Sequence, residues 1–170
     1  FFDPDVLTPD EIAARKTGLG MLLDRPVVVY LGLLADYQGT PLLIQAVQDL
    51  DRRGIDVHFL IMGFPGVSYY QEMAADLDVS HRVTFTGKVD YEQAPSHLAL
   101  GDVAVAPKLS ATEGCGKILN YMAMGLPTVT FDTPVSHEYL GRLGMYVRQG
   151  GDATDLADAI SGLLTDPQQR

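Results

Sequence analysis

A glycine-containing loop followed by a short helical pattern is the stretch of this sequence best suited to bind an anion. The loop reads Glu-Gly-Cys-Gly from Glu113 to Gly116, and Lys117 begins the pattern that runs to Met124. Glycine lets the backbone approach a ligand closely, and the first amides of a helix lack an internal acceptor and carry partial positive charge. Residues 107 to 131 therefore predict a strand, a loop and a helix that together form a phosphate site.

Two lysines add positive charge to this stretch. Lys117 falls in the first turn of the expected helix, where a cation is electrostatically unfavourable unless an anion lies nearby. Lys108 directly follows an apolar run, and a cation at the carboxyl end of a parallel strand can point into a binding crevice. The alternative for Lys108 is an ordinary surface lysine.

Glu113 and Cys115 each allow two readings. The Glu113 carboxylate could accept hydrogen bonds from sugar or ribose hydroxyls, or it could be a solvated loop acid that interacts favourably with the helix dipole. Cys115 could be a reactive thiol beside a helix N-terminus and Lys117, or a small residue that lines the loop.

Several other kinds of site lack their sequence signatures. The chain contains no G-x-G-x-x-G fingerprint, no G-x-x-x-x-G-K-[ST] phosphate loop and no G-x-S-x-G elbow. The four histidines, His58, His81, His97 and His137, lie on different elements without metal-ligand spacing, so no metal is expected. We expect His58, His81 and His97 to be structural or solvated.

Composition narrows the class of protein further. Lys and Arg total 12 against 22 Asp and Glu in 170 residues, and the net charge of -10 disfavours nucleic acid and anionic membranes as partners. The single cysteine excludes an internal disulfide framework and fits a reducing compartment, so we expect a cytoplasmic protein. No apolar run approaches the roughly 18 residues of a membrane span.

Short apolar runs alternate with helical patterns along the chain and predict an α/β fold. We expect a doubly wound, mainly parallel six-stranded sheet, because parallel strands need helical crossovers that cover both faces. A capping box of Ser68 and Gln71 is expected to start one of the helices. The strands are expected at 27–31, 57–62, 83–86, 103–106, 128–131 and 145–147, and the helices from residue 8, at 40–50, 68–77, 90–100, 117–124, 136–143 and 152–164.

The stretch K-I-L-N-Y-M-A-M-G-L-P, residues 117 to 127, resembles a motif of the GT-B glycosyltransferases. It is similar to the C-terminal, donor-binding domain of the family-four (group 1) retaining enzymes, whose pattern is E-G-F-G-x-x-x-x-E-A-M-A-x-G-x-P. The resemblance extends from Val27 to Pro167 and includes residues 83–89, 101–103 and 151–167. It implies the Rossmann-like half of a GT-B fold, which binds a UDP-, GDP- or ADP-linked sugar as substrate and needs no cofactor or metal.

The resemblance also implies roles for individual residues. The backbone around Gly87 to Val89 would lie along the base, the Glu113 to Gly116 loop along the sugar and diphosphate, and Asn120 at the ribose hydroxyls. We expect Glu113 and Lys117 to be the catalytic residues. The implied donor-binding residues are Gly32, Gln38, Gly63, Val89, Lys108, Gly114, Cys115, Gly116, Leu119 and Asn120.

The sequence departs from the family pattern at three positions. Arg and Lys commonly hold the phosphates in the first loop, where this chain has Leu33 and Gln38. Asn120 replaces the second glutamate of the motif, one residue closer to the first than usual, and cannot make a charge-assisted bond worth roughly 1.5 to 3 kcal/mol. Our hypothesis is that Lys117 and Lys108 replace the missing first-loop cations.

The sequence is interpreted as part of a longer enzyme. Residues 1–25 are expected to form an interdomain linker and a leading helix, and residues 26–170 a nucleotide-sugar-binding domain. The acceptor would be held by the protein's own N-terminal domain, which this sequence does not include, so the fragment alone is expected to be inactive. The implied context is glycolipid or polysaccharide biosynthesis. A peripheral membrane contact through the missing domain is compatible with this context.

Two other functions remain open at this point. The three departures are also compatible with a non-catalytic binding or scaffolding domain that has lost donor chemistry. The same architecture also serves as half of a nucleotide-sugar epimerase or phosphorylase. Nucleotide binding and product analysis would separate these alternatives.

Overall fold

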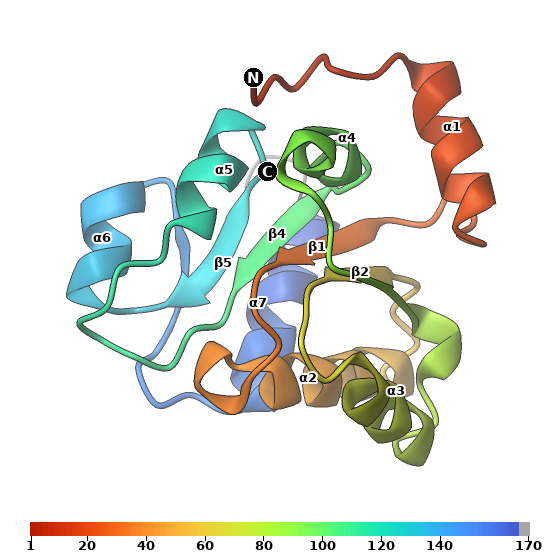
Figure 1. The fold of residues 1–170 in the computed structure, drawn as a ribbon. Helices are drawn as coiled ribbons and strands as arrows, with labels where there is room; N and C mark the ends of the chain where they lie inside the picture. The colour runs from red at the N-terminus through yellow and green to blue at the C-terminus, as the bar shows by residue number, and fades with distance from the viewer. Residues whose placement is uncertain (167–170) are drawn as a thin grey trace.

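Strands and helices alternate along the chain in the computed structural model, which describes residues 1–166 (Figure 1). The predicted α/β fold is confirmed, and the strand bounds agree with the prediction to within one residue. The end of the resemblance at Pro167 lies outside the described residues. The strands are β1 (Val27–Leu31), β2 (His58–Met62), β3 (Val83–Gly87), β4 (Val103–Ala106), β5 (Thr128–Phe131) and β6 (Met145–Val147). The helices are α1 (Pro9–Gly18), α2 (Thr40–Arg52), α3 (Val67–Asp76), α4 (Ala94–Leu98), α5 (Lys117–Ala123), α6 (Pro134–Leu140) and α7 (Ala153–Thr165), with short 3-10 turns η1 (Asp36–Gln38), η2 (Ser80–Arg82) and η3 (Tyr91–Gln93).

The six strands form one parallel sheet in the order β3-β2-β1-β4-β5-β6. The strand order reverses between β1 and β4, so the sheet is doubly wound, and the binding crevice of such a sheet lies at this point. β1 pairs with β2 along its whole length, but with β4 only at Val28 and Val29. The carboxyl ends of β1 and β4 therefore diverge and leave room for other groups between them.

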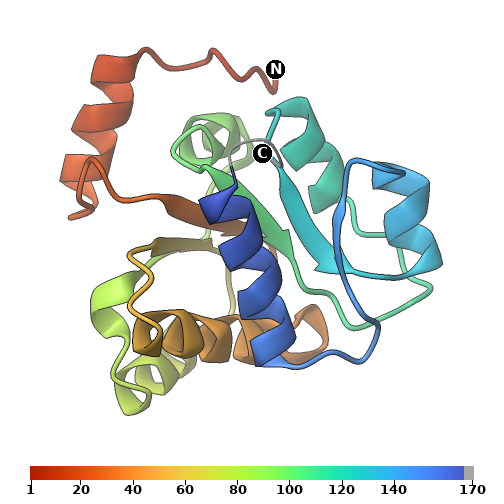
Figure 2. The ribbon, with the colours of Figure 1, turned by 180° about the vertical axis from the view of Figure 1, so that it is seen from behind.

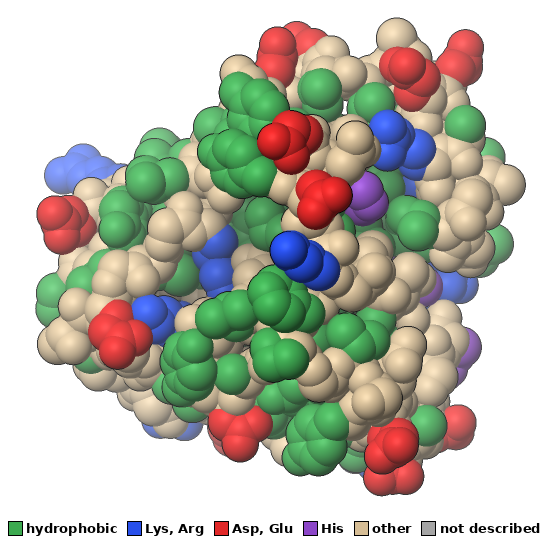
Figure 3. Space-filling view, in the orientation of Figure 1, with side chains coloured by type: hydrophobic (Ala, Val, Ile, Leu, Met, Phe, Trp, Pro, Cys, Tyr) green, Lys and Arg blue, Asp and Glu red, His purple; other side chains and the backbone are tan. Residues whose placement is uncertain are grey.

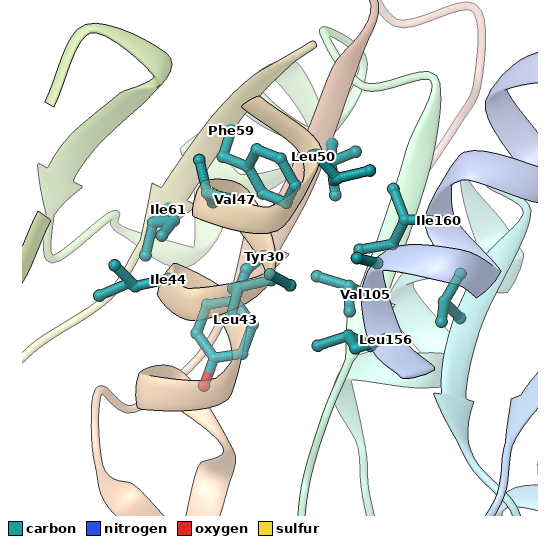
Figure 4. Close-up of a cluster of buried hydrophobic side chains, with 14 of the residues drawn as sticks. Tyr30, Leu43, Ile44, Val47, Leu50, Phe59, Ile61, Val105, Leu156 and Ile160 are labelled. Carbon is teal, nitrogen blue, oxygen red and sulfur yellow. The ribbon is translucent and has the colours of Figure 1, made fainter. Parts of the chain in front are cut away.

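Helices cover both faces of the sheet because alternate side chains of each buried strand point to opposite sides. In β1, Val28 and Tyr30 pack in the cluster that includes side chains of α2, α3 and α7, whereas Val27 and Val29 pack with side chains of α4, α5 and α6. Figure 2 shows α2 and α7 on the same side of the sheet. Their apolar side chains point toward Tyr30 and the strands in Figure 4, as the helical spacing of the α2 residues predicts.

Local sequence signals explain most helix starts. Thr8 forms a capping box with Glu11 at α1, and Asp152 forms one with Asp155 at α7. The predicted capping box of Ser68 and Gln71 is wrong, because α3 begins one residue earlier and its N-cap is a glycine without a side chain to accept a bond.

Two predicted helices have different bounds in the structure. The helix expected at 90–100 is divided into η3 and the short α4, which has Pro95 in its first turn. Proline lacks an N–H and is favoured at a helix start, so α4 begins there. The helix expected at 136–143 is α6, which begins at Pro134 because the Thr133 hydroxyl caps it by accepting from the Ser136 amide. The proposed boundary between a linker and a domain at residue 25 stays a prediction.

His58 is a structural residue of β2 and makes stability depend on pH. Its Nε2 lies 2.8 Å from the Thr84 hydroxyl, and its buried Nδ1 has no partner among the described residues. Burial, together with the nearby Arg25 and Arg82 charges, lowers the pKa of His58 from 6.5 to about 4. The unfolded chain therefore binds more protons than the folded chain between these two values, and the stability from neutral His58 is lost as the pH falls from 6.5 to 4.

We expect the free energy of unfolding to fall by up to about 3 kcal/mol through this residue between pH 7 and pH 4. His58→Gln can keep a hydrogen bond to Thr84 without titrating. Urea unfolding of both proteins at several pH values measures the difference. Equal pH dependence in the variant and the original chain would show that His58 does not contribute in this way.

Candidate functional site

Three glycines lie side by side where the first three strands end. Gly32 follows β1, Gly63 follows β2, and Gly87 ends β3. The Gly32 amide donates to the Met62 carbonyl at 3.0 Å, and the Gly63 amide donates to the Gly87 carbonyl at 2.9 Å. A Cβ at Gly63 would lie 2.0 Å from the Gly32 oxygen, so no larger residue fits. The glycines thus let the backbone segments after β1, β2 and β3 pack closely together at the carboxyl edge of the sheet.

The loop after β1 is fastened to the segment after β4. Gly39 has φ of 77°, and a Cβ there would lie 2.0 Å from the Pro107 carbonyl oxygen. The Leu109 amide donates to the Tyr37 carbonyl at 3.0 Å. Both contacts cross the point where β1 and β4 diverge, and they hold η1, with Gln38, beside the loop that precedes α5.

The Lys117 side chain places its ammonium group between the diverging carboxyl ends of β1 and β4. Its Nζ donates to the Gln38 Oε1 at 2.9 Å and to the Tyr30 hydroxyl at 3.1 Å, and it lies 4.2 Å from the centre of the Tyr30 ring. A Cβ at Gly32 would lie 2.7 Å from Nζ, so the missing side chain of Gly32 makes room for the lysine. The structure thus brings together three predicted site residues, Gly32, Gln38 and Lys117, from distant parts of the chain.

Within residues 1–166, no carboxylate forms an ion pair with the Lys117 ammonium. The pKa of Lys117 is lowered from 10.5 to about 8, mainly by burial; Cys115 opposes this shift, and the positive charge of Lys108 adds to it. The ammonium is therefore cationic at neutral pH with neutral partners only. Such a group is stabilised strongly by an anion, because burial strengthens the attraction between opposite charges.

Lys108 has a different environment. Its Nζ forms an ion pair with the Glu113 carboxylate at 2.9 Å and donates to the Gly114 carbonyl at 3.0 Å. The Lys108 side chain is 10% exposed, whereas that of Glu113 is 64% exposed. Lys108 is therefore not a plain surface lysine, but its charge is already compensated, and the two readings of Glu113 miss this ion pair.

The rest of the loop packs the start of α5. Cys115 is buried in the apolar cluster beneath α5, and burial raises the pKa of its thiol, which opposes a reactive thiolate. Gly116 is the N-cap of α5. The amides of Ile118 and Leu119 donate to the carbonyls of Cys115 and Gly116, so two amides expected to face an anion are already used.

Tyr30 and Tyr121 are site residues that the sequence interpretation missed. The buried Tyr121 hydroxyl accepts from the Leu31 amide at 2.8 Å and donates to the Val105 carbonyl at 3.3 Å. It thereby bridges β1 and β4 beyond their last paired residues. A tyrosine at position 30 in an otherwise aliphatic strand run was the available signal for Tyr30, because a buried hydroxyl needs a partner.

Three further predicted donor-binding residues, Val89, Leu119 and Asn120, make no hydrogen bond to Lys117, Gln38 or Tyr30. Val89 is partly buried against the apolar cluster on the α5 side of the sheet, and the Leu119 side chain is exposed on α5. Asn120 is partly buried in the middle of α5, and its side-chain amide forms no hydrogen bond with any residue of the range 1–166. The roles that the resemblance implies for these three residues stay predictions.

Apolar side chains surround the site on the surface. Exposed residues on the loops after β1, β2 and β4 and on the start of α3 contribute them, and Figure 3 shows hydrophobic side chains gathered on this face of the molecule with Lys and Arg among them. Phe64 also has the Lys88 ammonium 5.7 Å from its ring centre. The exposed apolar residues are Leu33, Tyr37, Phe64, Tyr69 and Leu109.

A separate apolar pocket of about 590 Å³ lies at the other edge of the sheet. Met122, Thr128, Leu143 and Met145 are among its lining residues, at the end of α5 and the starts of β5 and β6. None of the predicted site residues lines it.

Two further features are absent from residues 1–166. No helix there is long and apolar enough to cross a bilayer. No group of three or more His, Cys, Asp or Glu side chains in the same range could hold a metal ion.

Comparison with protein families and curated sequences identifies relatives over nearly the whole chain. The family model for glycosyl transferases group 1 matches residues 25–166. The GDP-mannose-dependent alpha-(1-6)-phosphatidylinositol monomannoside mannosyltransferase of Mycolicibacterium smegmatis is 34% identical over 180 residues, covering 98% of this chain and 46% of that protein. The alpha-D-kanosaminyltransferase of Streptomyces kanamyceticus is 33% identical over 150 residues, covering 86% of this chain and 38% of that protein.

Solved structures share the fold. Anabaena Alr3699/HepE in complex with UDP-glucose superposes with a TM-score of 0.82 at 22% identity, over 99% of this chain and 47% of that chain. The C-terminal domain of a glycosyl transferase group 1 family protein from Francisella tularensis gives a TM-score of 0.76 at 18% identity, over 99% of this chain and 87% of that chain.

The chain spans about half the length, or somewhat less, of the curated relatives described above, at 46% and 38%. The family model covers most of the chain, and the mannosyltransferase exceeds 30% identity over nearly all of it. The chain belongs to the glycosyl transferases group 1 family.

Proposed function

We propose that this chain is the donor-binding half of a retaining glycosyltransferase of family four, which moves a sugar from a nucleotide-sugar to an acceptor. The observation that carries the proposal is the Lys117 ammonium, held by neutral groups beside the glycine-lined carboxyl ends of β1 and β2. The named transferase relatives and the UDP-glucose complex of a structural neighbour support the same substrate class.

The site is suited to stabilise a leaving diphosphate. Negative charge grows on the diphosphate as its bond to the sugar breaks, and a fixed cation stabilises that charge most where water is largely excluded. Lys117 is such a cation, and it lies against Gly32 at the carboxyl end of β1. We propose that Lys117 takes the place of the first-loop cations without a metal, while Lys108 acts through its contacts to Glu113 and Gly114 and shapes the loop.

A second domain of the same protein is the proposed cover for this edge. The apolar side chains around the site, among them Leu33, Tyr37 and Leu109, are from 43% to 50% exposed. Exposed apolar surface of this kind marks contact sites in proteins. We propose that an N-terminal acceptor domain packs here, that any membrane contact runs through it, and that the enzyme works in the cytoplasm.

Titration of the chain with UDP, GDP and ADP by calorimetry tests the proposed function. We expect one nucleotide to bind more tightly than the others, and a donor screen on the intact protein with the matching nucleotide-sugars should then give a glycosylated product with retained configuration. A chain that binds none of the three nucleotides would contradict the proposal and favour a non-catalytic domain with this fold.

A further inference from the structure

Gln38 contacts the Lys117 ammonium where a carboxylate would be the usual partner. Lysine carries three N–H donors, and two of them bond to the Gln38 Oε1 and the Tyr30 hydroxyl. The third has no partner among residues 1–166. The other ionisable groups close to the ammonium are Cys115 and Lys108, and the Glu113 carboxylate in the loop before α5 is paired with Lys108.

Gln38 is itself held firmly. It is buried, with 9% of its surface exposed, and it ends the turn η1. The next residue, Gly39, fits against the Pro107 carbonyl, and the preceding Tyr37 accepts a hydrogen bond from Leu109. The side-chain oxygen of Gln38 therefore has a fixed place from which to orient the lysine.

We propose that Gln38 is a positioning residue, whose neutral oxygen orients the Lys117 ammonium against Gly32 while leaving its charge free for the donor's diphosphate. The inference rests on the proposed function and assigns a role within the same site. A carboxylate at this position would form an ion pair with Lys117 and compensate the charge that the diphosphate needs. An apolar side chain would leave the ammonium without one of its two oxygen partners.

Gln38→Glu separates these roles because the two side chains have nearly the same shape. The titration of the Lys117 side chain, followed by NMR in the free chain, is expected to move to higher pH by at least about one unit, since the new carboxylate favours the charged lysine. The affinity for UDP and for inorganic pyrophosphate is expected to fall at least about tenfold, because the positive charge of Lys117 is then already paired with the new carboxylate. The thermal midpoint should not fall, because the new ion pair forms within the folded site.

Gln38→Met and Gln45→Glu are the companion variants. Gln38→Met lacks the oxygen, so the Lys117 titration should move to lower pH and binding should weaken. Gln45 is exposed on α2, and Gln45→Glu makes the same change in net charge away from the lysine, so it should leave both readouts unchanged. This control distinguishes local pairing from a general effect of charge.

The outcomes separate this inference from the proposed function. If the unaltered chain binds neither nucleotides nor pyrophosphate, the proposed function fails, and the Lys117 titration in Gln38→Glu still decides whether Gln38 acts on Lys117. If the unaltered chain binds UDP and Gln38→Glu binds it equally well, the positioning role is overturned while the proposed function stands. An unchanged Lys117 titration in Gln38→Glu overturns it as well.

Discussion

Lys117→Met is expected to weaken nucleotide binding by about tenfold to a hundredfold, because it removes a charge-assisted bond worth roughly 1.5 to 3 kcal/mol. Methionine keeps most of the length of the side chain, so the space beside Gly32 stays filled. The Tyr30 hydroxyl donates to the Leu33 carbonyl at 2.6 Å, so it keeps a partner when the lysine is replaced. Calorimetry with UDP, GDP and ADP at pH 7 measures the loss, and the thermal midpoint shows whether the variant is folded.

The pH dependence and a second lysine serve as controls for this prediction. Since the pKa of Lys117 is about 8, the affinity of the original chain should fall as the pH rises above 8, and that of Lys117→Met should not. Lys108→Ala should cost less affinity, because the Lys108 charge is compensated by Glu113. Equal losses in the two variants, or no loss in Lys117→Met, would contradict the assigned role of Lys117.

Gly39→Ala is expected to have the largest effect on stability. A Cβ would lie 2.0 Å from the Pro107 oxygen, and the φ of 77° is itself unfavourable for alanine. Because backbone lies on both sides of the contact, the segments after β1 and β4 must separate. We expect a loss of at least about 3 kcal/mol in the free energy of unfolding, measured in urea, or failure to fold.

Gly54→Ala is the matched control for this substitution. Gly54 has nearly the same backbone conformation, with φ of 71°, but no atom lies within 4 Å of the added Cβ. It should cost only about 1 kcal/mol, the price of the backbone conformation alone. Similar costs for both variants would show that the contact between Gly39 and Pro107 does not hold the loops together.

Local patterns determine the parts of the fold that the sequence predicted well. The continuous apolar run Val27–Leu31 is typical of a strand buried on both faces, and the spacing of Leu43, Ala46, Val47 and Leu50 fits one face of α2. The misassigned start of α3 has a local cause too. A serine and a glutamine at capping-box spacing were outweighed by Gly66, whose left-handed backbone, with φ of 75°, starts the helix one residue earlier.

The candidate site was predicted less completely because its contacts join residues far apart in the sequence. Lys117 and Gln38 were both identified as site residues, but the bond between them spans 79 positions and depends on how β1 and β4 diverge. The same divergence gives Tyr121 its bridging role. The pairing of Lys108 with Glu113 depends on the path of the loop, which residue types alone do not determine.

Amide NMR mapping tests most directly whether the carboxyl edge of the sheet is the donor site. The chain is titrated with whichever of UDP, GDP and ADP binds most tightly, and the amide signals are followed residue by residue. The largest changes are predicted at Gly32, Gly63 and Gly87 and at Lys117. Changes confined to the apolar pocket at the opposite edge, around Leu143, with none at the three glycines or Lys117, would contradict this account.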